Sequence, residues 1–176
     1  MNKYRITVLL VLIIAALAIR FMPQPPNFTP VAALALFSGV FFRDRFAAML
    51  APLAVMIISD LFLGWHNTIP FVYLSFILMV LIGRAIRPKV SVGYVAGGGI
   101  TGAMLFFIIT NFGVWLAGSM YPKTIEGLAA AYIAAIPFLH YMVISTLMYS
   151  AILFGVFIWT EKYFPVIREE HGHIKV

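Results

Sequence analysis

The sequence predicts an all-α membrane protein, a polytopic bundle of about six transmembrane helices with both termini in the cytoplasm. The first two observations behind this prediction are the high hydrophobic content and the low charged content. Of the 176 residues, 63% are hydrophobic and only 10% are charged, and the mean hydropathy is +1.02. Soluble domains carry about 45–50% apolar and about 25% charged residues, so a soluble core could not cover this much apolar surface. The third observation is that the apolar residues form helix-length runs, with the basic residues between them.

Each apolar run has a length that suits a helix in a bilayer, which takes about 20 residues, or fewer when the helix is enclosed by others. The predicted helices form one domain and are 6–21, 29–42, 46–64, 69–83, 92–118 and 136–160. The first follows basic residues and carries Ala16-Leu17-Ala18 near its end, so a cleaved signal peptide is its alternative interpretation. The second is short, and we expect it to pack among the other helices.

The remaining segments carry helix signals of their own. Pro52 and Pro70 lie near the starts of the third and fourth helices, where a missing N–H costs little. The Gly97-Gly98-Gly99 run in the fifth suits close helix packing, because a nucleotide-binding loop would need a strand before it. Mixed charges follow the sixth helix, so we expect 161–176 to be a solvated cytoplasmic tail.

The basic residues predict the orientation. With the N-terminus inside, all of the 12 Lys and Arg residues except Arg20 and Lys123 fall on the cytoplasmic side. Cytoplasmic loops carry an excess of Lys and Arg, so both termini are expected inside a bacterial cell membrane. Because these basic residues are scattered in short loops, we expect no nucleic-acid partner.

Polar residues within the helices gather toward the outer side of this topology. Asp60 lies near the outer end of the third helix, Asn111 near that of the fifth, and His140 about one turn into the sixth. An Asp at mid-span costs about 2.5–3.5 kcal/mol on insertion scales, and such residues usually face an interior or a wet cavity. We therefore expect a small cavity, open to the outside, that binds a small molecule. Its predicted residues are Asp60, Asn111, His140, Trp115, His66, Asn27, Tyr141 and Ser145.

Each of these residues also has a purely structural explanation. Asp60 would bond a neighbouring helix, and Asn111 would join two helices as hydrogen-bonding glue. His66 would lie at the membrane interface beside an anchoring Trp65. Arg20, not counted among the binding residues, is either the one cation near the outer cavity or a residue that only extends its charge to water.

The sequence favours neither an enzyme nor a cofactor protein. It has no cysteine, so it has no disulfide, thiolate metal site or cysteine nucleophile. There is no second buried acid beside Asp60, and no Ser–His–acid motif. His66, His140 and Asp60 are the residue types of a two-histidine, one-carboxylate metal site, but their spacing does not favour one.

Four strings resemble a family of uncharacterised bacterial integral membrane proteins, over most of the chain from about Arg20. They are NFTPVAALALFSG, SDLFLGWH, ITNFGVWLAGSMYPKTIEGL and AYIAAIPFLHY. A wider similarity is to the S components of energy-coupling factor vitamin transporters, which have six helices and a pocket under their outer loops. That similarity implies uptake of a vitamin-like nutrient with a separate ATPase module as partner. The chain departs from it in helix one, where Ala15, Ala16 and Ala18 lack the Ala-x-x-x-Ala docking spacing.

The leading hypothesis is therefore an S-component-like uptake protein for a small water-soluble nutrient. A proton-coupled permease with Asp60 as the titrating group is the second hypothesis. A scaffold subunit of another membrane complex, in which polar groups only join helices, is the third.

Overall fold

The structure is a computed structural model that describes residues 2–168, and these residues contain helices and no strand. The six α-helices are α1 (Lys3–Arg20), α2 (Val31–Phe41), α3 (Arg45–Leu63), α4 (Ile69–Ile86), α5 (Val92–Ala117) and α6 (Ile125–Tyr163). Two short 3-10 helices are η1 (Arg87–Lys89) and η2 (Pro165–Ile167). The predicted all-helical fold with six helices is confirmed.

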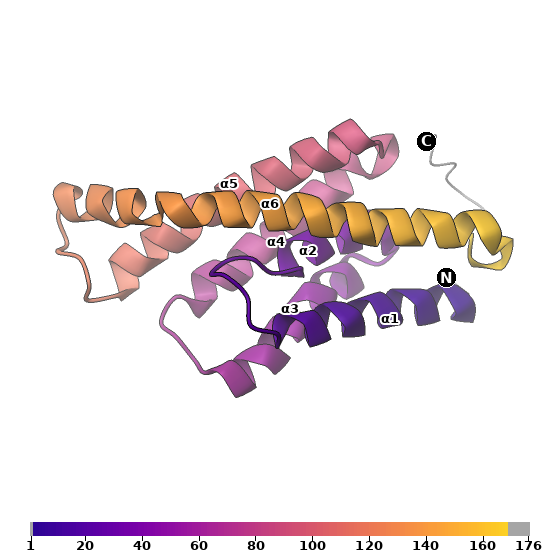
Figure 1. Cartoon of the computed structure of the whole chain (residues 1–176), viewed down its shortest axis with the longest axis horizontal. Coiled ribbons are helices and arrows are strands. Elements are labelled where there is room, and N and C mark those ends of the chain that lie inside the picture. Colours follow the sequence, from indigo (N-terminus) through magenta and orange to yellow (C-terminus); the bar gives the residue numbers. More distant parts are fainter. Residues whose placement is uncertain (1, 169–176) are drawn as a thin grey trace.

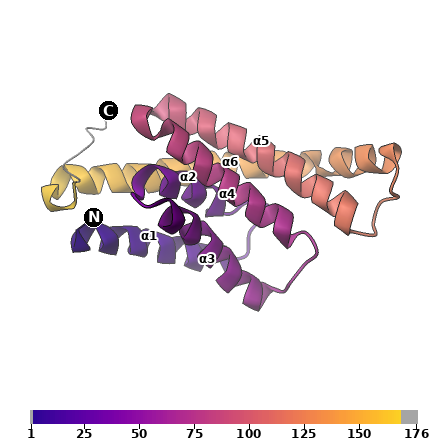
Figure 2. The same ribbon diagram turned by 180° about the vertical axis from the view of Figure 1, so that it is seen from behind.

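Four of the helices are long and apolar enough to cross a membrane: α3, α4 with η1, α5 and α6. The shorter α2 is apolar throughout, and α1 carries basic residues at both of its ends. Successive helices alternate in direction, so the start of α1 and the end of α6 lie at one end of the bundle (Figures 1 and 2). We call this the terminal end and the opposite one the cavity end.

The centre of the bundle is α2, every residue of which is buried. It packs against α3, α4 and α6. Its backbone meets that of α4 at Gly39 and Gly83. A Cβ atom built on Gly39 would lie 2.2 Å from the carbonyl oxygen of Val80, and one on Gly83 would lie 2.2 Å from that of Leu36. Because glycine has no Cβ atom, these two positions allow the backbones of α2 and α4 to approach this closely.

An aromatic cluster joins α2 to α6 at the terminal end. Phe37 and Phe41 contact Phe154 and Phe157, with ring centroids 4.4–5.4 Å apart. Phe37, Phe41 and Phe157 are among the largest fully buried side chains of the described residues. Since aromatic pairs in such arrangements add stabilisation beyond their buried area, this half of the bundle is a packed core.

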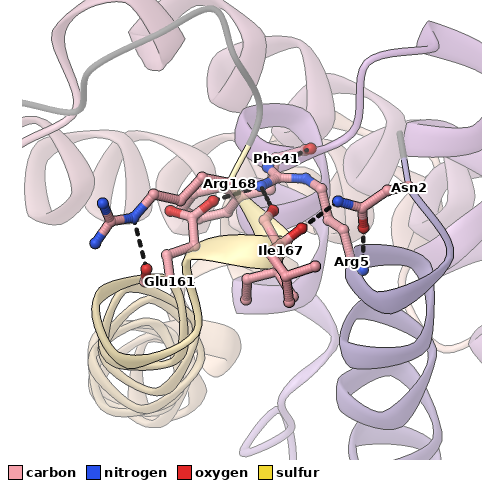
Figure 3. A network of polar contacts seen from close by, with 7 residues as sticks. Asn2, Arg5, Phe41, Glu161, Ile167 and Arg168 are labelled. Carbon is pink, nitrogen blue, oxygen red and sulfur yellow. Dashed lines mark hydrogen bonds and ion pairs between the residues drawn. The ribbon is translucent and has the colours of Figure 1, made fainter.

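The C-terminal end of α2 stops inside the bundle, where its last carbonyl groups need partners. Arg5, only 4% exposed, donates to the Phe41 carbonyl oxygen at 3.3 Å and forms an ion pair with Glu161 (Figure 3). Arg87 donates to the Phe42 carbonyl oxygen at 3.1 Å. Two guanidinium groups thus satisfy the buried end of α2 and complement the negative end of its dipole.

The same network fastens the segment after α6. Arg5 also donates to the carbonyl oxygen of Ile167 at 3.1 Å, and the Asn2 side chain bonds that of Val166 (Figure 3). Ile167 is 2% exposed. The part of the expected solvated tail up to residue 168 is therefore packed against the bundle, and residues 169–176 of that tail lie outside the described residues.

The sixth helix begins earlier than the predicted residue 136, so most of the stretch 119–135 between the fifth and sixth predicted helices is helical. It begins at Ile125, after Thr124, whose hydroxyl accepts a hydrogen bond from the Gly127 N–H. The connection from α5 is only Gly118–Thr124. At about 1.5 Å per residue, the 39 residues of α6 span about 58 Å, nearly twice a hydrocarbon core of about 30 Å. The α5–α6 connection accordingly extends beyond the α3–α4 connection in both views (Figures 1 and 2).

Candidate functional site

A cavity of about 290 Å³ lies at the cavity end of the bundle. Helices α1, α3, α4, α5 and α6 contribute to its wall, together with the connections before α2 and before α4. Its apolar wall is formed by Met56, Val72, Phe76, Phe106, Val114, Ala135, Phe138 and Met142. Its polar groups come from Arg20, Asn27, Thr29, His66, Thr68, Thr110 and Asn111. The volume is at the small end of ligand sites, which run from about 300 Å³ upward, and an apolar wall with a few polar groups is typical of them.

The charged part of the wall is Arg20, which is the last residue of α1. Its Nε donates to the Ser59 hydroxyl at 2.6 Å, and its Nη2 donates to Asp60 Oδ1 at 3.3 Å. The other oxygen of Asp60 accepts a hydrogen bond from the Tyr73 hydroxyl at 2.9 Å. Asp60 thus links α1, α3 and α4 directly behind the cavity wall.

The ion pair is partly shielded from water. The Asp60 side chain is 3% exposed and the Arg20 side chain 16%. The remaining guanidinium nitrogen, Nη1, makes no hydrogen bond to the residues that the structure describes. Asp60 itself does not line the cavity, so its direct role is to hold and neutralise Arg20, which does line it.

The connection before α2 carries Asn27 and Thr29 to the cavity. Asn27 has a φ of 62°, a left-handed conformation that asparagine tolerates better than most residues. Its carbonyl oxygen lies 3.2 Å from the Ser145 hydroxyl, and the Phe28 ring contacts that of Tyr149. Ser145, predicted to bind ligand, is fully buried and fastens this connection to α6.

Asn111 lines the cavity from α5. Its side-chain nitrogen donates to the Phe107 carbonyl oxygen at 2.7 Å, one turn earlier in the same helix. The neighbouring Thr110 bonds the Phe106 carbonyl oxygen in the same manner. Only one of the two N–H groups of this amide is engaged in that bond, so the second N–H and the amide oxygen of Asn111 remain available for hydrogen bonds in the cavity.

The rim is formed by the connection before α4. Gly64 has a φ of 105° and ends α3, which turns the chain toward Trp65 and His66. The His66 ring nitrogen Nδ1 lies 2.7 Å from the Thr68 hydroxyl, and both residues line the cavity. His66 is exposed, so it lies at the opening.

Three other predicted residues lie outside the cavity wall. The Trp115 indole donates to the Pro122 carbonyl oxygen at 2.9 Å and thereby joins α5 to the α5–α6 connection. His140 is exposed, and its ring contacts that of Tyr141 in a tilted arrangement with centroids 4.0 Å apart. Phe138 and Met142 reach the cavity from α6. Because residues two apart on a helix point in nearly opposite directions, His140 points away from it.

Arg20 and the aromatic residues of the cavity wall were not among the binding residues predicted from the sequence. The signal for Arg20 was present, since it is one of two cations expected outside and Asp60 is the acid nearest to that side. Phe76 and Phe106, whose rings are 5.4 Å apart, have the same apolar character as any lipid-facing residue, so nothing in the sequence separated them. Among the described residues, no three His, Asp or Glu side chains are grouped as metal ligands.

The fold and the site together define a class: a helical bundle with four helices fit to cross a membrane and a partly polar cavity at one end. The chain belongs to a family of unknown function, DUF6580, whose sequence profile matches residues 1–167. No curated protein and no solved structure matches the chain. The resemblance to an uncharacterised family is confirmed, and the more distant one to S components stays a prediction.

Proposed function

We propose that this protein is a multi-pass bacterial cell-membrane protein that binds a small polar solute from outside and takes part in its uptake, as an S-component-like subunit does. The observation that carries the proposal is the cavity, in which Arg20, Asn27 and Asn111 converge from three parts of the chain. Polar groups inside an apolar bundle are costly, and they usually mark a path or a site for a polar solute.

The shape of the bundle favours a binding pocket over an open channel. The cavity reaches Thr29, two residues before α2 begins, and the fully buried α2 lies between it and the terminal end. Toward the terminal end, Phe37 of α2 packs against Phe157 of α6. A solute is therefore held at one end of the bundle.

The side of the membrane follows from the basic residues. The terminal end carries Lys3, Arg5 and Lys162, while the cavity end carries Arg20 and Lys123. Cytoplasmic connections are usually the ones enriched in Lys and Arg, and this supports a cavity that opens to the outside.

The test is to identify what the cavity holds. Protein purified in mild detergent is examined by native mass spectrometry, and its small molecules are extracted and identified. Ala135→Phe fills the cavity from α6, and Ala134→Phe adds the same bulk on the exposed side of that helix. We expect a bound solute in the wild type and in Ala134→Phe, and its loss in Ala135→Phe.

Uptake is then measured with the identified solute in cells that lack or carry the gene. Uptake that depends on the protein and is lost in Ala135→Phe supports the proposal. Preparations that hold no solute in any form, from cells grown in rich and in minimal medium alike, would contradict it.

A further inference from the structure

We infer that the cavity takes a small organic monocarboxylate, with its carboxylate on the free edge of Arg20 and its apolar body against Phe76 and Phe106. This inference rests on the proposed function, since it names the class of solute for the same cavity. It depends on the charges of the wall, the donors left free on Arg20 and the distribution of apolar side chains.

The charges of the cavity wall favour an anionic ligand over a cationic one. Among the described residues that line the cavity, Arg20 is the only Lys, Arg, Asp or Glu. A cationic ligand would meet a guanidinium group and no facing carboxylate, because Asp60 lies behind the wall with both oxygens engaged. An anionic ligand would meet the Arg20 guanidinium group and no carboxylate in the described part of the wall.

The guanidinium group has donors left for a ligand. Arginine carries five N–H donors in a planar fork, and Arg20 uses one on Ser59 and one on Asp60. The Nη1 donors and the second donor of Nη2 are not engaged by described residues. A carboxylate matches this pair of nitrogens in a bidentate arrangement, which gives stronger bonds than a neutral carbonyl does.

Asp60 explains why a single negative charge is favoured. With the cavity empty, the Asp60–Arg20 pair is neutral, so no bare charge is buried. One carboxylate adds a single negative charge that donors already in place can bind. The N-terminal end of α2 has no side-chain cap, and Thr29 just before it lines the cavity, so the positive end of the helix dipole adds to the preference. A dianion would face Asp60 at close range without a second cation.

The rest of the wall describes the body of the ligand. Phe76, Phe106 and Met142 form an apolar surface, and the Asn111 side chain offers its amide oxygen and one N–H for hydrogen bonds to the ligand. The cavity of about 290 Å³ suits a compact molecule and excludes large cofactors such as dinucleotides. A carboxylate joined to one ring fits this description.

The experiment compares three probes of one shape and different charge: phenylacetate, phenylacetamide and phenethylamine. Binding to the purified protein in detergent is measured by calorimetry. We expect phenylacetate to bind at least about tenfold more tightly than phenylacetamide, as a charge-assisted pair does, and phenethylamine to be the weakest. Arg20→Gln should remove the difference between acid and amide, and Lys123→Gln, which removes the other outer cation, should keep it.

Arg20→Gln leaves Asp60 buried without its partner, so the Arg20→Gln, Asp60→Asn double variant is measured beside it. We expect this variant to fold and to bind acid and amide alike. An equal affinity of the wild type for both, a preference for the amine, or an acid preference that persists in the double variant would overturn the inference. So would the absence of binding by all three probes. In each case the search for a co-purified solute with Ala135→Phe still decides the proposed function on its own.

Discussion

The crossing of α2 and α4 at Gly39 gives the sharpest test of the packing. Gly39→Ala places a Cβ atom 2.2 Å from the Val80 carbonyl oxygen and 2.9 Å from the Gly83 Cα. Ordinary contacts of this kind begin at 3.4 Å, so the two backbones must separate by about 1 Å. Both partners are backbone atoms, which no change of rotamer can relieve.

The magnitude follows from what such a separation removes. A gap of about 0.5–1 Å forfeits a quarter to a half of each dispersion contact, and α2 is buried over its whole length. Overpacking typically costs about 1–3 kcal/mol, and this backbone collision puts Gly39→Ala at about 3 kcal/mol. In a chain of this size each kcal/mol lowers Tm by about 2–4 °C, so we expect a loss of about 6–12 °C.

The assay is thermal unfolding in a fixed detergent, followed by circular dichroism. Gly97→Ala is the matched control, because a Cβ atom on Gly97 would meet nothing within 4 Å and alanine is the better helix former by about 1 kcal/mol. We expect this control to keep or raise Tm. If Gly39→Ala unfolds at the temperature of Gly97→Ala, the close approach of α2 and α4 is refuted.

Three further predictions concern the polar contacts. Asp60→Asn alone should lower the free energy of unfolding by about 3 kcal/mol because Arg20 loses its charged partner, and Arg20→Gln with Asp60→Asn should lose much less than the sum of the two single variants. Additive losses in this double-mutant cycle would contradict a coupled pair. Ser145→Ala removes the hydrogen bond that fastens the connection carrying Asn27, so we expect solute binding, measured by calorimetry, to weaken severalfold. Thermal unfolding should show a change in Tm of only a few degrees. An unchanged affinity would show that other contacts hold this connection. Arg5→Met should destabilise by about 3–5 kcal/mol, because Glu161 and the end of α2 lose a buried partner at once, and should leave solute affinity in the surviving folded protein unchanged; a stable variant would contradict the network of Figure 3.

The helices could be predicted because hydropathy and basic residues mark membrane segments directly. The start of α6 could not, since Gly118, Ser119 and Pro122 indicate a loop and nothing in the apolar residues after them separates loop from helix. A length limit taken from the bilayer also misleads there, because α6 is longer than a bilayer is thick.

The sequence predicted how far along each helix the polar residues lie, but not which way their side chains point. Counting residues along each helix put Asp60 and Asn111 at the right end of the bundle, and Asn111 does line the cavity. It placed His140 by the same rule, yet the rotation of α6 about its axis turns His140 outward. That rotation is set by packing against α2 and α5, which no local pattern in the sequence contains.

The short central helix has a mechanical consequence. At about 1.5 Å per residue, the 11 residues of α2 are about 17 Å long, about half of a hydrocarbon core. The close contact at Gly39 and Gly83 holds α2 against α4, and Arg5 and Arg87 bind the carbonyl groups at its C-terminal end. The helix is therefore fixed in the middle of the bundle. If the cavity holds a solute, as proposed, α2 blocks a straight path from the cavity to the terminal end, so release at that end would require α2 to move or the bundle to tilt.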